Sequence, residues 1–87
     1  MTERSNSDVL KRLKRAYGHL AVVVNMLEAE RECVDVAQQL HAVEKAIANA
    51  KQTLIRDHID ECLEQSTKDK KGASKTVRTF KEITKYL

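Results

Sequence analysis

The chain of 87 residues contains no proline and no tryptophan, and it has only two glycines, two cysteines and three aromatic residues. Because proline ends helices and glycine weakens them, their scarcity favours long helices. A chain of this size buries only about 60–65% of the surface that its unfolded form exposes, so its folded monomer is only marginally stable. The composition therefore predicts an all-α single domain, residues 1–87, that gains further core by self-association.

The sequence also lacks any apolar run of 18 residues, which excludes a predicted membrane span, and it does not open with a signal peptide. We therefore expect a cytoplasmic protein without a membrane partner. Thiols stay reduced in the cytoplasm, so two cysteines there favour metal or redox chemistry over a structural disulfide. The net charge of +3 permits nucleic acid as a partner without requiring it.

Apolar residues recur every three or four positions in three parts of the chain, which is the spacing of a helical seam. The first seam comprises Leu10, Leu13, Tyr17, Leu20, Val24 and Leu27. The second comprises Val36, Leu40, Val43, Ile47, Ala50 and Leu54, and the third Val77, Phe80, Ile83 and Leu87. These patterns predict a long helix over residues 6–29, a second long helix over 31–65, a polar linker over 66–73 and a short helix over 74–86.

Three residues of the second helix have the chemistry of metal ligands: Cys33, His58 and Cys62. His58 and Cys62 stand one helical turn apart and continue the apolar seam. In a straight helix the 25 steps from Cys33 to His58 span roughly 38 Å, at about 1.5 Å per residue. One chain cannot close such a site, whereas two antiparallel copies can. The spacing predicts a homo-oligomer with metal or thiol chemistry at the subunit seam.

Two thiolates and one imidazole form a soft, three-coordinate donor set, which suits Cu(I). Structural Zn(II) prefers four ligands, and Asp57, Asp60 or Glu61 could supply the fourth, while Ni(II) favours more nitrogen and oxygen donors; both are less favoured. The alternative is that the cysteines are small core residues. His19 and His41 are interpreted as structural or surface residues.

The first helix carries a basic strip opposite its apolar seam. It comprises Lys11, Arg12, Lys14 and Arg15, with Arg4 in the same arc. A solvated helix face is the ordinary interpretation of such a strip, and a phosphate-binding surface, enlarged by symmetry, is the functional one. No helix-turn-helix, zinc finger or basic zipper is present, so any DNA binding is unconventional. No phosphate loop or substrate pocket is recognisable, so neither an enzyme nor a small-molecule substrate is expected.

Five segments resemble the copper-sensitive operon repressors, a family that also includes nickel/cobalt, formaldehyde and persulfide sensors. They are residues 10–20 (LKRLKRAYGHL), 25–28 (NMLE), 33–36 (CVDV), 38–40 (QQL) and 57–63 (DHIDECL). The resemblance implies three helices per chain, an antiparallel homodimer that forms a four-helix bundle, and dimers paired into a flat tetramer. It also implies a repressor that binds operator double-stranded DNA through basic faces, with Arg12 at the position of the family's DNA-contact arginine.

The resemblance further implies that Cu(I) is held by Cys33 of one protomer with His58 and Cys62 of the other. Metal binding then lowers DNA affinity and releases copper-efflux genes. Nickel/cobalt sensors add an N-terminal histidine, which residues 1–10 lack. Formaldehyde sensors lack the second cysteine and persulfide sensors lack the histidine, so the ligand set matches the copper branch.

The chain departs from the copper branch around the ligands. Glu32 stands where copper members commonly have a tyrosine, and the last helix has no acid before Glu82 where they have a glutamate. Asn49 replaces a basic residue that many members carry in the second helix. Because an outer partner orients a ligating histidine, Glu32 becomes the candidate for that role. Two alternatives remain: a thiol-based sensor of persulfide or aldehyde in the same family, and a helical copper-buffering scaffold with no DNA role.

Overall fold

The computed structural model describes the backbone of residues 3–68 and 73–87, and the side chains of residues 6–61 and 77–87. Within these ranges the chain forms α1 (Glu3–Glu28), α2 (Cys33–Lys68), α3 (Ala73–Ile83) and the short 3₁₀ turn η1 (Thr84–Tyr86). The predicted all-α class with two long helices and one short helix is confirmed.

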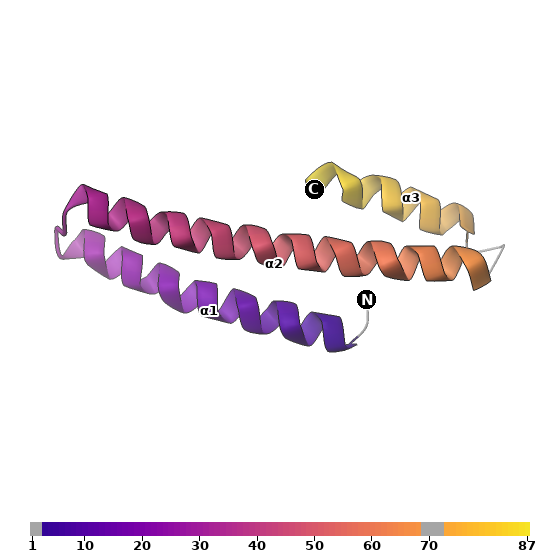
Figure 1. Cartoon of the computed structure of the whole chain (residues 1–87), viewed down its shortest axis with the longest axis horizontal. Helices are drawn as coiled ribbons and strands as arrows, with labels where there is room; N and C mark the ends of the chain where they lie inside the picture. Colours follow the sequence, from indigo (N-terminus) through magenta and orange to yellow (C-terminus); the bar gives the residue numbers. More distant parts are fainter. Residues whose placement is uncertain (1–2, 69–72) are drawn as a thin grey trace.

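The helices lie side by side in one thin layer. Figure 1 shows α1 and α2 as an antiparallel hairpin, with α3 folded back along the later half of α2 on the side away from α1. The molecule measures 58 × 23 × 14 Å along its principal axes. Since 14 Å is little more than the diameter of one helix, both broad faces of the layer are open.

The core between α1 and α2 is built from small side chains that repeat every seven positions. These buried residues are Val9, Ala16 and Val23 in α1, and Val36, Val43 and Ala50 in α2. Val23, Val36 and Val43 form one cluster, against which Met26 packs. Valine and alanine allow the helix axes to approach closely, but they fill only a narrow seam.

A hydrogen bond between the two helices agrees with this register. His19 Nε2 donates to Gln39 Oε1 at 2.7 Å in the tautomer that carries its proton on Nε2. His19 lies between Ala16 and Val23, and Gln39 lies between Val36 and Val43. The bond therefore crosses the hairpin between two layers of the core. The structure gives His19 the structural role that the sequence analysis assigned to it.

The hairpin turn needs no glycine. The N–H of Arg31 donates to the Met26 carbonyl at 3.0 Å, and the N–H of Glu30 donates to the Leu27 carbonyl at 3.1 Å. These two bonds form a Schellman motif, and Glu30 adopts the left-handed conformation that the motif requires, with φ of 56°. As a result α2 begins at Cys33, two residues later than residue 31, where the sequence analysis placed its start.

The other helix ends also differ from the predicted bounds. α1 begins at Glu3 rather than residue 6, and α2 continues to Lys68 rather than residue 65. Polar residues follow position 64, but no glycine or proline interrupts the helix there, so the backbone continues as a helix. Of the predicted linker over 66–73, residues 69–72 lie outside the described residues. α3 begins at Ala73 and passes into η1 at Thr84.

We predict that Glu30→Gly raises the free energy of unfolding by about 0.5–1 kcal/mol, because glycine adopts positive φ without the Cβ clash. Urea denaturation at fixed protein concentration measures the change, since concentration affects the stability of an oligomer. Glu28→Gly is the matched control: it removes the same charge from the last residue of α1 and should lower the stability by about the same amount. Equal destabilisation by both variants would contradict the role assigned to Glu30.

Candidate metal-sensing site

The large apolar side chains of the hairpin lie on its surface. The first seam, Leu10 to Leu27, is at least 40% exposed at every one of its six positions, with Tyr17 at 79%. The second seam divides, because Val36, Val43 and Ala50 face α1 whereas Leu40 and Ile47 are 46% and 44% exposed. Small residues therefore close the hairpin, and large residues are left for another contact.

The exposed rows of α1 and α2 share one side of the hairpin. At 100° per residue, each exposed row lies roughly 50–70° beyond the buried row of its helix, in the same rotational sense. Because the helices run antiparallel, the same direction of rotation in each helix places both exposed rows on the same side of the hairpin. We call this surface the apolar face; it comprises Leu10, Leu13, Tyr17, Leu20, Val24, Leu27, Leu40 and Ile47.

The apolar face is hollowed along α1. An open groove of about 310 Å³ is lined by Tyr17, Leu20, Ala21, Val24 and Asn25. Gly18 lies beside this groove in sequence, and a Cβ built on it would meet nothing within 4 Å. Within one chain, therefore, no packing requirement explains a glycine at this position.

Cys33 and His58 belong to the same side of α2 as Leu40 and Ile47. At 100° per residue these four positions fall within an arc of about 40°. Cys33 is exposed and is not in a disulfide. α2 is a single helix from Cys33 to Lys68, so the separation of roughly 38 Å holds in the folded chain. One protomer cannot bring Cys33 and His58 to a common metal ion.

One ring nitrogen of His58 has no hydrogen-bond partner among the described residues. This atom, Nε2, is buried. Leaving a buried polar atom unpaired costs about 1–3 kcal/mol, and such atoms are uncommon. With the proton on Nδ1, Nε2 presents a lone pair that can bind a metal ion. The residue therefore fits a metal site on chemical grounds.

The remaining predicted site residues are placed as follows. Cys62 follows His58 by one turn within α2, but its side chain lies outside the described residues. The Glu32 carbonyl accepts the N–H of Val36 at 3.1 Å, so Glu32 caps α2 directly before Cys33, and its side chain is exposed. Among side chains 6–61 and 77–87, no three His, Cys, Asp or Glu residues gather closely enough to hold a metal ion.

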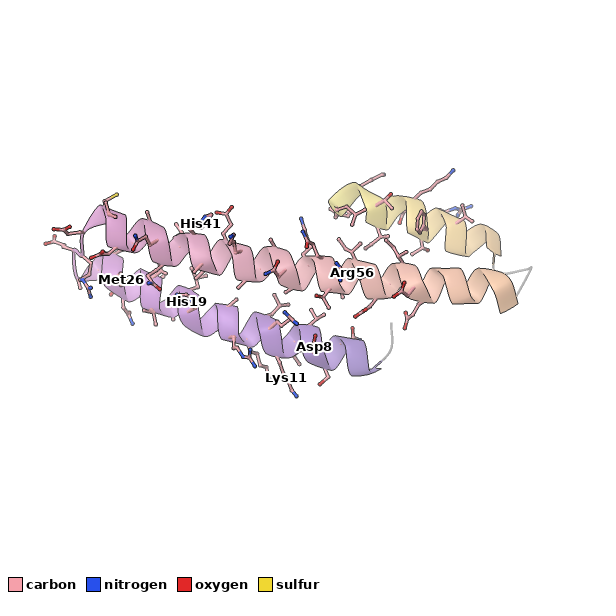
Figure 2. The ribbon with its side chains drawn as sticks, in the orientation of Figure 1. Asp8, Lys11, His19, Met26, His41 and Arg56 are labelled. Atoms are coloured by element: carbon pink, nitrogen blue, oxygen red, sulfur yellow. The ribbon has the colours of Figure 1, made fainter. Side chains whose placement is uncertain are left out.

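His41 lies apart from the ligand positions. It is exposed on α2, and Figure 2 shows it on the side of α2 away from α1. α1 packs against the opposite side of α2, so the His41 ring faces neither the hairpin core nor α1. This surface position agrees with the interpretation made from the sequence.

The basic strip of α1 is exposed at Lys11, Arg12, Lys14 and Arg15. Arg12 is not alone, because its Nε donates to Asp8 Oδ2 at 3.1 Å across one helical turn. Both side chains are about half exposed. Figure 2 shows Asp8 and Lys11 near the start of α1. Arg4 lies in the first turn of α1, outside the described side chains. The pairing of Asp8 with Arg12 was not predicted from the sequence, although their spacing of four is a recognisable signal.

Comparison with known proteins identifies the family. A family model described as metal-sensitive transcriptional repressor matches residues 5–87. The copper-sensing transcriptional repressor CsoR of Bacillus subtilis is 32% identical, with 97% of this chain and 86% of the relative covered. The CsoR of Mycobacterium ulcerans is 38% identical over 63 residues, which cover 72% of this chain and 54% of the relative. The chain thus spans about half the length of that mycobacterial relative.

A more distant relative is the copper-sensing transcriptional repressor RicR of Mycobacterium tuberculosis, at 32% identity over 61% of this chain and 55% of the relative. No solved structure matches the chain. The matched family is one of repressors and not of enzymes, in agreement with the sequence analysis. The match over residues 5–87 confirms the resemblance seen in the motifs, and the chain belongs to the metal-sensitive transcriptional repressor family.

Proposed function

We propose that the chain is a Cu(I)-responsive transcriptional repressor that binds operator DNA in its metal-free form and leaves DNA when Cu(I) binds. The observation that carries the proposal is the buried, unpartnered Nε2 of His58 on the side of α2 that also bears Cys33. The copper-sensing relatives support the identity of the metal. As a DNA-binding regulator it acts in the bacterial cytoplasm, and no described helix is long and apolar enough to span a membrane.

The positions of the ligands support an antiparallel homodimer with its two-fold axis near Ile47. Cys33 precedes Ile47 by 14 residues, and His58 and Cys62 follow it by 11 and 15. An axis at Ile47 therefore brings Cys33 of one α2 level with His58 and Cys62 of the other. The same axis sets Leu40, seven residues before Ile47, opposite Leu54, seven residues after it. The exposed row of α2 is thus self-complementary, as an isologous interface requires.

The dimer also explains why large apolar residues lie outside the hairpin core. Two apolar faces placed together form a four-helix bundle in which the leucines become core. A second chain over the groove at Tyr17 and Leu20 fills that hollow. The family resemblance extends the assembly to a flat tetramer of two such dimers. No small-molecule substrate is part of this function.

The metal would be held by the Cys33 thiolate of one protomer and by His58 and Cys62 of the other. When bound, Cu(I) accepts this low coordination number and prefers thiolate ligands, whereas Zn(II) and Ni(II) favour larger donor sets. Glu32 precedes Cys33 and would thus lie near His58 of the partner chain. Its carboxylate can accept the Nδ1 proton of that ring, which leaves Nε2 free for the metal.

Release from DNA requires that Cu(I) bind one conformation of the oligomer more tightly than another. The ligand can shift the equilibrium only by this difference in affinity, and DNA must in turn weaken Cu(I) binding by the same factor. Because each site joins two chains, occupancy restrains how the two α2 helices sit against each other. The basic strips, which include Arg12, lie on α1; because α1 packs on α2, the strips move with the α2 helices and lose their fit to the phosphates.

We predict that His58→Ala abolishes release from DNA and weakens Cu(I) binding. Loss of an outer-sphere partner typically weakens metal binding roughly 10–100-fold, and loss of a direct ligand should weaken it more. Anaerobic Cu(I) titration against a competing chelator, with and without promoter DNA, measures both effects. His41→Ala is the matched control and should leave both unchanged.

If His58→Ala still responded to a persulfide or an aldehyde at Cys33, the thiol-sensor alternative would replace the copper sensor. A chain that binds Cu(I) but no DNA at low salt would be a buffering scaffold.

We predict that Ile47→Glu converts the oligomer to monomers and removes tight Cu(I) binding, because both copies of the new charge meet at the two-fold axis. Sedimentation equilibrium gives the mass, and the chelator titration gives the affinity. Gln52→Glu introduces the same charge at an exposed position of α2 outside the apolar row, and it should alter neither. A dimer of Ile47→Glu with intact Cu(I) affinity would rule out this interface.

We predict that Asp8→Asn raises DNA affinity by about 2–5-fold, which corresponds to the modest energy of an exposed ion pair. The change frees the Arg12 guanidinium for phosphate and removes a negative charge from beside it. Fluorescence anisotropy with a labelled duplex at several salt concentrations measures the effect. Glu28→Gln makes the same charge change at the far end of α1 and should have a smaller effect. Weaker binding by Asp8→Asn would mean that the ion pair positions Arg12 for DNA.

A further inference from the structure

The positive charge of the chain is concentrated in its last quarter. Residues 66–87 contain seven Lys and Arg against two acidic residues, a net charge of +5. Residues 1–65 contain nine basic and eleven acidic residues, a net charge of −2. The two parts together give the total of +3. The α1–α2 hairpin, which includes the basic strip of α1, is therefore slightly acidic as a whole.

Three basic residues of α3 and η1 form one row. Arg78, Lys81 and Lys85 follow each other at spacings of three and four, and all three side chains are exposed. At 100° per residue the row occupies an arc of about 60°. Ile83 is half-buried and lies on the opposite side of the helix from this row. α3 packs on α2 (Figure 1), and because the row lies opposite the half-buried Ile83, we place it on the outer side of the molecule.

We propose that α3 and η1 form a second DNA-contacting element, in which Arg78, Lys81 and Lys85 bind backbone phosphates. This inference rests on the proposed function and adds a surface to the strip on α1. The row spans the seven steps from Arg78 to Lys85 and is about 10 Å long. Successive phosphates of one DNA strand advance about 3.4 Å along the axis, so each copy of α3 reaches two or three of them. Symmetry repeats the row in every protomer.

Double-stranded DNA fits this row better than a lipid surface does. A membrane-binding amphipathic helix inserts its apolar side among the lipids. In α3 the half-buried Ile83 turns that side toward α2 instead. The outer side carries Arg78, Lys81 and Lys85 at regular spacing, beside the exposed Glu82 and Val77, and the spacing of the three cations matches a chain of phosphates. The excess of five positive charges also offsets the slightly acidic hairpin, whose field alone opposes a polyanion.

The test compares the full-length chain with the triple variant Arg78→Gln, Lys81→Gln, Lys85→Gln. Anisotropy is measured on a duplex of the chain's own promoter region and on an unrelated duplex of equal length, over a range of KCl concentrations. We expect the triple variant to bind both duplexes at least about tenfold more weakly at 0.15 M salt. The slope of log affinity against log salt should fall by about 0.9 for each lost contact. Equal losses on both duplexes are expected, because phosphate contacts carry no sequence information.

The control is the charge-preserving swap Arg78→Lys, Lys81→Arg, Lys85→Arg, which should keep the wild-type slope. Circular dichroism and Cu(I) affinity should be the same in all three proteins. An unchanged slope in the glutamine variant would overturn the inference while leaving the proposed function intact. The inference would also be overturned if the glutamine variant lost binding to anionic phosphatidylserine vesicles but kept its DNA affinity. A wild-type protein that bound neither duplex at low salt would overturn the proposed function itself.

Discussion

The length of α2 is the constraint on which the rest of the molecule depends. A helix that runs without a break from Cys33 to Lys68 is rigid, and it holds the first thiol roughly 38 Å from the imidazole that shares its side. No rearrangement within one chain can join them while the helix persists. Metal chemistry at these residues is therefore possible only where two chains meet. In the proposed dimer, whatever orders the pair of α2 helices would also complete the metal site, so sensing would depend on assembly.

The positions of small and large side chains also favour the pairing of two chains. The hairpin is closed by valines and alanines, which satisfy the close approach of α1 and α2 but bury little surface. The leucines, Ile47 and Tyr17 stay on the open face of a layer only 14 Å deep. A single chain thus exposes more large apolar surface than a small monomer normally does. Burying this surface in a dimer would supply the stability that the thin internal core lacks, and it would bring Cys33 and His58 to the subunit boundary.

Much of this could be predicted from the sequence, and the remainder has physical reasons. The helices follow from the apolar spacing, and the chemistry of Cys33, His58 and Cys62 makes these residues the predicted ligand set. The spacing alone could not separate Val43 from Ile47, because a seven-residue repeat produces two adjacent rows and only side-chain size distinguishes them. The turn at Glu30 has no glycine signal, so the start of α2 was placed two residues early. The orphaned Nε2 of His58 depends on atomic packing that no pattern encodes.

The central claim is that each metal site takes Cys33 from one chain and His58 with Cys62 from another. The most direct measurement mixes two inactive variants, Cys33→Ala and the double variant His58→Ala, Cys62→Ala, after unfolding and refolding them together. Each mixed dimer then contains one complete site and one empty site. The account predicts that neither variant alone binds Cu(I) tightly, while the mixture recovers about a quarter of the wild-type sites, since random pairing makes about half of the dimers mixed. No recovery in demonstrably mixed dimers would contradict the account.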